Sequence, residues 1–196
     1  MTKHFTKLAL AVLCGLFVAQ FCFAQNLIDA EEYAVYSDLL KKTYGDDATS
    51  NFAIHKNISA KFIEDDNEYI VRKLSPIDVD LIKDFNERNN SEAEIQNRFN
   101  LKSKVYLVGD ELKEIFKSPQ TEGELIEEKD WEAFRKQYQA FSLLSLSRVG
   151  FNKKRDKALV VLGSQYGYLA GDGFYYLLVK KRSGWKIKNK VRAWIS

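Results

Sequence analysis

The C-terminal stretch, Ser145 to Ser196, constrains the fold more than any other part of the chain. Four apolar runs rich in β-branched and aromatic residues cover about 143–151, 157–162, 173–181 and 185–195. Runs of this length and composition predict strands, and the short polar connections at 152–156 and 182–184 predict tight turns between them. We therefore expect a C-terminal four-stranded antiparallel meander.

Segments with helical periodicity precede this meander. The predicted helices cover 26–44, 75–87, 110–117 and 130–138, and two short strands are predicted at 52–57 and 105–108. Ser75 and Pro76 are typical of a helix start, and Gly45 is typical of a helix end. Helices followed by antiparallel strands predict a single α+β domain over residues 25–196, with the helices packed on the meander. By analogy only, NTF2-like and cystatin-like cones have this arrangement.

Residues 1–24 have the pattern of a secretory signal peptide. A short basic start precedes a 16-residue apolar run from Leu8 to Phe23, and small residues at Cys22 and Ala24 predict cleavage before Gln25. The run is shorter than the roughly 20 residues that span a bilayer. We expect an exported protein, periplasmic or extracellular, without a transmembrane segment after cleavage.

Residue types exclude several chemistries. Cys14 and Cys22 are the only cysteines, and both lie in the predicted signal peptide. The mature chain would therefore have no disulfide, no catalytic thiol and no cysteine-ligated metal. His55 is the only histidine after residue 24, which excludes a multi-histidine metal site. We expect neither a metal nor a cofactor.

Charge is distributed unevenly along the chain. Residues 25–140 carry 25 acids and 16 bases, a net charge of −9, whereas residues 141–196 carry 2 acids and 12 bases, a net charge of +10. Lys186, Lys188, Lys190 and Arg192 alternate with other residues, so a regular strand would place them on one face. This face is either a solvated outer surface or a binding surface for an acidic partner.

The segment Gly163–Gly173 is predicted to be a long, glycine-rich connection between two strands. Glycines allow backbone N–H groups to approach an anion, Asp172 is its only carboxylate, and Tyr166 and Tyr168 could stack on a ligand. It lacks the Gly-Lys-Ser/Thr of a phosphate loop, so a wide hairpin connection is the alternative.

Three residues are predicted to be structural. Arg148 lies inside a predicted strand among apolar residues, and a buried arginine needs a carboxylate partner, which the sequence does not identify. Trp185 and Trp194 lie in the last strand and are predicted to belong to the core.

Several motifs resemble those of a family of uncharacterised bacterial secreted proteins, and the resemblance covers nearly all of the mature chain. The motifs are Glu32–Ser37, Ser147–Asn152, Ala158–Val160, the glycine-rich segment, Gly184-Trp185 and the closing Trp194-Ile195-Ser196. The resemblance implies a bacterial origin and no particular activity. Members often carry cysteines where this chain has Ser164–Tyr166 and Leu169-Ala170, so a disulfide or metal role for this segment is excluded here.

The sequence therefore predicts a non-catalytic exported domain that binds through the basic face and the glycine-rich segment. Its partner would be an anionic envelope component or a protein, and not a nucleic acid. One alternative is a small-pocket enzyme of hydrolase or isomerase type that uses Asp, Tyr or His55 as acid–base groups. Another is a periplasmic immunity or inhibitor protein.

Overall fold

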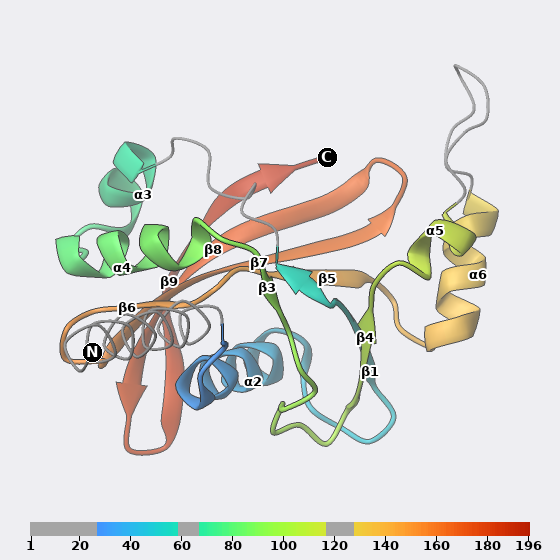
Figure 1. Ribbon diagram of the computed structural model, residues 1–196, viewed down its shortest axis with the longest axis horizontal. Helices are drawn as coiled ribbons and strands as arrows, with labels where there is room; N and C mark the ends of the chain where they lie inside the picture. The colour runs from blue at the N-terminus through green and yellow to red at the C-terminus, as the bar shows by residue number, and fades with distance from the viewer. Residues whose placement is uncertain (1–26, 59–66, 117–127) are drawn as a thin grey trace, which may run out of the picture.

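The computed structural model describes residues 27–58, 67–116 and 128–196, and confirms the α+β class with C-terminal antiparallel strands (Figure 1). The predicted signal peptide and the cleavage point lie outside the described residues. The described elements are α2 (Ala30–Tyr44), β1 (Asn51–His55), β2 (Asn57–Ile58), α3 (Asn67–Leu74), α4 (Val79–Asn89), β3 (Ala93–Glu94), β4 (Lys104–Val108), α5 (Leu112–Ile115), α6 (Glu128–Tyr138), β5 (Leu143–Leu146), β6 (Gly150–Phe151), β7 (Lys157–Gly167), β8 (Ala170–Lys181) and β9 (Gly184–Ile195).

In the described part of the chain, seven strands form one mixed sheet. Its path runs β4-β1-β5-β7-β8-β9, and β6 pairs with β7. The predicted meander corresponds to β5, β7, β8 and β9, which are antiparallel neighbours. The sheet extends further because β1 lies between β4 and β5, parallel to both. The continuous buried run Phe52-Ala53-Ile54 suits this position, since an inner parallel strand is covered on both faces.

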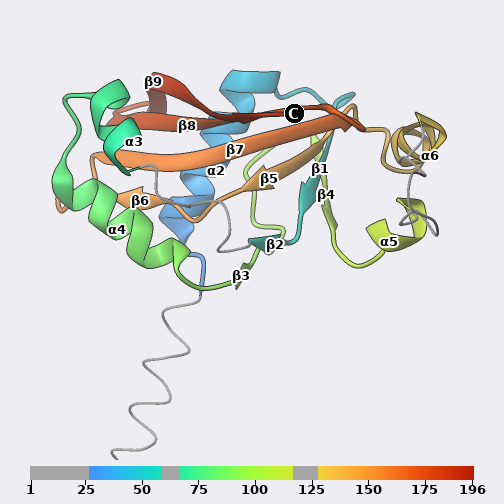
Figure 2. The same ribbon diagram turned by 90° about the horizontal axis from the view of Figure 1, so that it is seen from above.

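Helices cover both faces of the sheet (Figure 2). Side chains of β7 alternate between the two faces. Val160 and Leu162 belong to the same core cluster as Tyr36 of α2. Leu159 belongs instead to a second cluster that contains Phe85 of α4. We call these two sides the α2 face and the α4 face. Within the described residues, no helix combines the length and the hydrophobicity needed to cross a bilayer.

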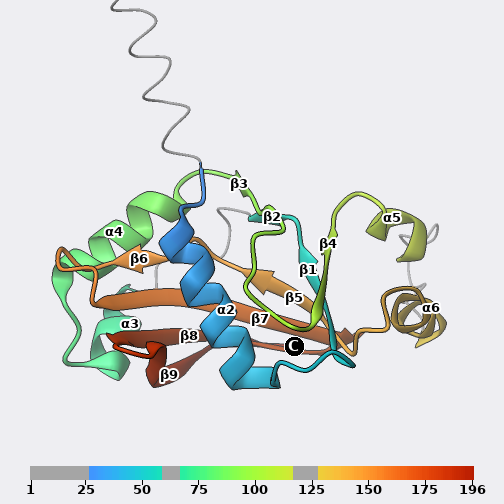
Figure 3. The ribbon, with the colours of Figure 1, turned by 90° about the horizontal axis from the view of Figure 1, so that it is seen from below.

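Helix α2 lies along one face (Figure 3), and its own sequence fixes both of its ends. The Asp29 side chain accepts a hydrogen bond from the Glu32 backbone N–H at 2.9 Å, and the Glu32 carboxylate accepts one from the Asp29 N–H at 3.2 Å. This capping box starts the helix at Ala30, four residues later than predicted. At the other end, Gly45 adopts a φ of +90° and stops the helix, as predicted.

The strand predicted over 143–151 is interrupted at Ser147–Val149. At Arg148 and Val149, side chains of two helices replace the usual ladder partners. The Arg148 N–H donates to Asn89 Oδ1 at 2.8 Å, and the Val149 N–H donates to Glu32 Oε2 at 3.0 Å. The chain therefore forms two short strands, β5 and β6, and these hydrogen bonds hold the segment between them. The Arg148 side chain points into the core.

The helix predicted to begin at Ser75 begins at Val79 instead. Asp78 is the N-cap residue, in extended conformation, and the Ser75–Pro76 peptide bond is cis. The Asp78 carboxylate does not cap the helix because it accepts from Lys157 Nζ at 2.8 Å. Before this point, residues 67–74 form α3, a helix that was not among those predicted from the sequence.

The prediction of a long glycine-rich loop at Gly163–Gly173 is wrong. Strand β7 runs to Gly167 and β8 begins at Ala170, so only two residues form the turn. Gly163 lies opposite Gly173 in the ladder. A Cβ on either glycine would overlap the indole of Trp194, which lies across them on the α4 face. The glycines therefore allow a tryptophan to approach the sheet closely, and they do not form an anion-binding loop.

Candidate functional site

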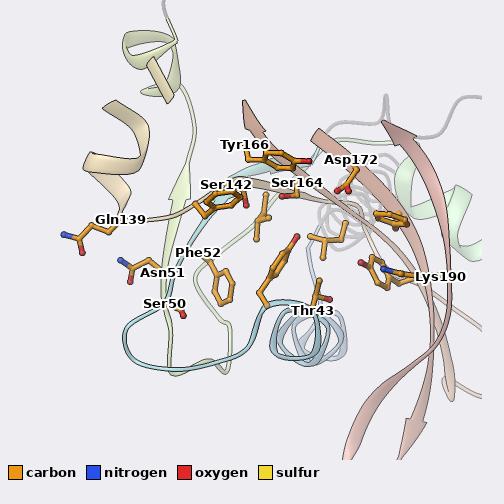
Figure 4. Close-up of a pocket in the computed structure, with 16 residues that line it drawn as sticks. Thr43, Ser50, Asn51, Phe52, Gln139, Ser142, Ser164, Tyr166, Asp172 and Lys190 are labelled. Atoms are coloured by element: carbon orange, nitrogen blue, oxygen red, sulfur yellow. The ribbon is translucent and has the colours of Figure 1, made fainter. Parts of the chain in front are cut away.

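A cavity of about 560 Å³ opens on the α2 face. Its walls come from the C-terminal end of α2, the loops that lead into β1 and β5, and strands β7, β8 and β9 (Figure 4). Aromatic and aliphatic side chains form much of the lining, including Phe52, Leu144, Leu162 and Phe174. The volume falls within the range of about 300–1,000 Å³ that is usual for small-molecule sites.

Three tyrosines line this cavity, Tyr44, Tyr166 and Tyr176. Partial burial raises the pKa of Tyr44 to about 12, although 42 % of this residue stays exposed and the neighbouring Ser164 hydroxyl acts to lower the pKa. Burial also raises the pKa of Tyr176, against the effect of the nearby Thr43 hydroxyl. The negative charge of Asp172 adds to both increases. Both phenols are therefore protonated at neutral pH and can donate hydrogen bonds to a ligand.

Thr43 offers a further polar group at this wall. Its buried Oγ1 lies near enough to the Tyr176 hydroxyl to act on the pKa of that phenol, but no well-aligned hydrogen bond joins it to a described residue. A buried hydroxyl without a partner costs free energy, so a ligand or water that fills the cavity would relieve this cost.

Asp172 places a carboxylate at the edge of the cavity. It lies on β8 opposite Ser164 of β7, and Figure 4 shows both side chains at the same wall. Within the described residues, the Asp172 carboxylate takes part in no hydrogen bond and no ion pair. Because it is only partly exposed, this charge lacks the full hydration of a surface carboxylate and can bind a cationic or hydrogen-bonding group.

Lys190 and Arg192 lie on the same face of the sheet as this carboxylate. Lys190 lies opposite Tyr176 and Arg192 lies opposite Phe174. Lys190 Nζ is 4.6 Å from the centroid of the Phe174 ring, and Arg192 Cζ is 5.9 Å from it. Neither cation forms an ion pair within the described residues. Lys190, which lines the cavity, and Arg192 beside it are therefore two cations close to one aromatic ring.

The prediction that four basic residues of β9 share one face is wrong. The ladder shifts register between Leu177 and Leu178, which gives β9 an extra residue. Lys186 lies opposite Val179 and so faces the α4 side. Lys188 lies on that side as well, because it contributes, after Lys157, to lowering the pKa of Asp78 at the start of α4. A bulge therefore separates Lys186 and Lys188 from the cavity.

Exposed apolar side chains surround the end of the cavity beside the β7–β8 turn. The Phe141 and Tyr166 rings stack with centroids 5.7 Å apart, and both line the cavity. Phe141, Leu169 and Ile195 keep 71 %, 70 % and 67 % of their surface exposed. We call Phe141, Tyr166, Leu169 and Ile195 the apolar rim. Tyr168, predicted with Tyr166 to stack on a ligand, lies in the turn and does not line the cavity.

A second cavity, of about 330 Å³, lies on the α4 face. His55, Ser145 and Trp194 line it. Burial lowers the pKa of His55, which favours the neutral imidazole. His55 is therefore separated by the sheet from the Asp172 carboxylate and from the phenols. Of the acid–base groups that the sequence suggested, Asp172 and tyrosines share the main cavity, and His55 lies in the second one.

The three residues predicted to be structural do not line the main cavity. Arg148 is buried against Glu32, and Trp185 is buried with its indole N–H donating to Glu31 Oε1 at 2.9 Å. Trp194 lies across the glycines of β7 and β8.

The main cavity contains the groups of a ligand-binding site and no recognisable metal site. Within the described ranges, no three His, Cys, Asp or Glu side chains gather in a way that would hold a metal ion. The sequence pointed to Asp172, Tyr166 and Lys190 but missed Tyr44, Thr43 and Tyr176. Alternation along β8 was the available signal for Tyr176, since residues two apart share a face with Asp172.

Comparison of this chain with protein-family models, with curated proteins and with solved structures found no match.

Proposed function

We propose that this protein is an exported bacterial binding protein without catalytic activity, and that its ligand site is the cavity on the α2 face. The observation that carries the proposal is an aromatic cavity with polar groups that have no partner. The Asp172 carboxylate and the Lys190 ammonium form no ion pair, and Thr43 Oγ1 forms no hydrogen bond in the described part of the chain.

The composition of the lining favours a small amphipathic ligand. The aromatic rings would contact its apolar part, while the phenols of Tyr44 and Tyr176 would donate to its polar part. The basic face predicted from the sequence supports this role only in part, because Lys190 and Arg192 alone lie on the cavity side of β9. An anionic group of the ligand would bind these two residues.

Binding can be tested with N-phenyl-1-naphthylamine, a neutral fluorophore that brightens in apolar sites. We expect saturable binding to the wild type. Ser142→Trp fills part of the cavity and should weaken binding at least about tenfold. Ser183→Trp makes the same change in the exposed β8–β9 turn, at the other end of the sheet, and should bind as the wild type does. The absence of binding, or equal weakening by both substitutions, would refute the proposal.

The pattern of residues 1–24 supports the export part of this proposal. N-terminal sequencing of protein from the exported fraction should begin at Gln25. Protein that is found there with Met1 intact would contradict export by cleavage.

An acid–base enzyme in the same cavity is a second candidate, because Asp172 lies on one wall with two protonated phenols. Asp172 would accept a proton and a phenol would donate one. Mass spectrometry of a bound ligand after long incubation separates the two functions. An unchanged ligand supports a binding protein, whereas conversion that disappears in Asp172→Asn supports an enzyme.

A further inference from the structure

Charges of both signs that lack an ion pair within the described residues occur together at the cavity. At the other end of the same strands, Lys157 is paired with Asp78 at 2.8 Å and Lys180 is paired with Glu31 at 2.9 Å. At the cavity, no described residue pairs with Asp172, Lys190 or Arg192. A carboxylate and two cations without a protein partner therefore lie on one face of the sheet at the cavity, where a ligand can reach them.

These groups lie close together on one face of the sheet and yet form no ion pair with one another. Asp172 and Phe174 are adjacent on the α2 face of β8, so their Cα atoms are roughly 6–7 Å apart. Both cations are held over the Phe174 ring, with Lys190 Nζ at 4.6 Å from its centroid. The cationic site and the carboxylate are thus about one strand pleat apart, with an aromatic ring beside the cations.

We propose that the ligand is a zwitterion, with its cationic group against Asp172 and its anionic group against Lys190 and Arg192. This inference rests on the proposed function of the cavity. A molecule whose opposite charges are separated by several bonds would bridge the two sites and satisfy both at once. A molecule with a single charge would satisfy one site and leave the other unpaired.

The surroundings fit each end of such a ligand. The protonated phenols of Tyr44 and Tyr176 lie within the field of Asp172, and their oxygens can accept from an ammonium group. The apolar rim provides contact area for a side chain or an acyl chain that leaves the cavity. Dipeptides and the phosphoethanolamine headgroup of lipids share this chemistry, and experiment must distinguish these two sources.

Competition against N-phenyl-1-naphthylamine tests the inference with matched probes. The peptide series is Leu-Phe, its N-acetyl form and its C-terminal amide. The lipid series is lysophosphatidylethanolamine, below its micelle concentration, and its N-acetyl form. We expect a zwitterion of at least one series to bind about tenfold or more tightly than its singly charged derivatives. The series in which this occurs identifies the source.

Variants assign each charge to its site. Asp172→Asn should remove the advantage of the zwitterion over its N-acetyl form. In the peptide series, Lys190→Gln with Arg192→Gln should remove the advantage of the zwitterion over its amide. In the lipid series, the same double variant should weaken the binding of both lipids. Lys186→Gln with Lys188→Gln removes equal charge from the α4 face and should change nothing.

The inference is overturned if the wild type binds the fluorophore but neither zwitterion competes, or if the singly charged forms compete equally well. Unchanged selectivity in Asp172→Asn also overturns it. These results leave the proposed binding function intact, whereas failure of the fluorophore itself to bind would refute that function separately.

Discussion

Arg148 and Glu32 form a bidentate ion pair inside the core, although they are 116 residues apart in the sequence. Arg148 Nη2 donates to Glu32 Oε1 at 2.7 Å and Arg148 Nε donates to Oε2 at 2.9 Å. The two side chains are 1 % and 0 % exposed. Burial acts to lower the pKa of Arg148, but the hydrogen bonds and charge of Glu32 outweigh burial and raise it. The pair therefore joins α2 to the β5–β6 segment as two charged groups.

Breaking this pair should destabilise the protein strongly. Glu32→Gln removes the carboxylate that binds the buried Arg148 guanidinium, and Arg148→Met leaves the buried Glu32 carboxylate with only Arg88 at 3.3 Å. Each substitution should lower the free energy of unfolding by about 3–5 kcal/mol. Urea denaturation measures the change. Lys83→Ala, which breaks the exposed Lys83–Glu87 pair, is the control and should have almost no effect. A similarly small loss for Glu32→Gln would contradict a buried, charged pair.

Trp194 should limit the size of the side chain that position 173 can hold. A Cβ on Gly173 would lie only 2.7 Å from Trp194 Cδ1. Gly173→Ala should therefore lower the free energy of unfolding by about 1–3 kcal/mol through overpacking. Trp194→Ala should lower the free energy of unfolding less in the Gly173→Ala background than in the wild type. Gly109→Ala, where a Cβ meets only side-chain atoms at 3.4 Å or more, should be tolerated. Additive losses in the double variant would show that the two residues do not contact each other.

The phenol of Tyr44 should titrate late. Its pKa of about 12 exceeds the ordinary value of 10.0, so the unfolded chain ionises first and stability is lost as pH rises from 10.0 towards 12. Asp172→Asn should lower the Tyr44 pKa because it removes a nearby negative charge, and Ser164→Ala should raise it. NMR of ¹³C-labelled tyrosine measures each ring, and Glu87→Gln on α4 is the control. A Tyr44 pKa that does not respond to Asp172→Asn would place the carboxylate away from this wall.

Protonation of His55 should oppose folding. Burial holds its pKa below the ordinary 6.5, so the unfolded chain takes up a proton at higher pH than the folded chain. The free energy of unfolding of the wild type should therefore fall, relative to His55→Gln, as the pH decreases below about 6.5. Denaturation curves at about pH 7.5 and about pH 5 provide this difference. If the two proteins lose equal stability, the imidazole is not buried.

The strand-forming C-terminus and the C-terminal end of α2 could be predicted from the sequence because local rules determine them. The alternation of apolar residues identifies β7, β8 and β9, and Gly45 marks a helix end. The break between β5 and β6 could not be predicted, because it depends on hydrogen bonds from Asn89 and Glu32, which are distant in sequence. The role of Gly163 and Gly173 was missed for the same reason, since Trp194 reaches them only in the folded sheet.

The candidate site was predicted only in part. Asp172 and Tyr166 were selected from a segment that was thought to be a loop, and they reach the cavity because that segment is a paired hairpin. The basic residues were assigned to one face on the assumption of regular alternation. One bulge in β9 is enough to separate Lys186 from Lys190, and no local sequence signal marks its position.

Mapping of ligand contacts by NMR tests the central claim most directly. Amide shifts of ¹⁵N-labelled protein would be followed during titration with N-phenyl-1-naphthylamine. The largest changes should occur at Thr43, Ser142 and Tyr176, which line the cavity on the α2 face, while the indole N–H of Trp194 should change little. Largest changes at His55 and Trp194, or changes spread evenly over the molecule, would contradict a ligand site between α2 and the β7–β8 hairpin.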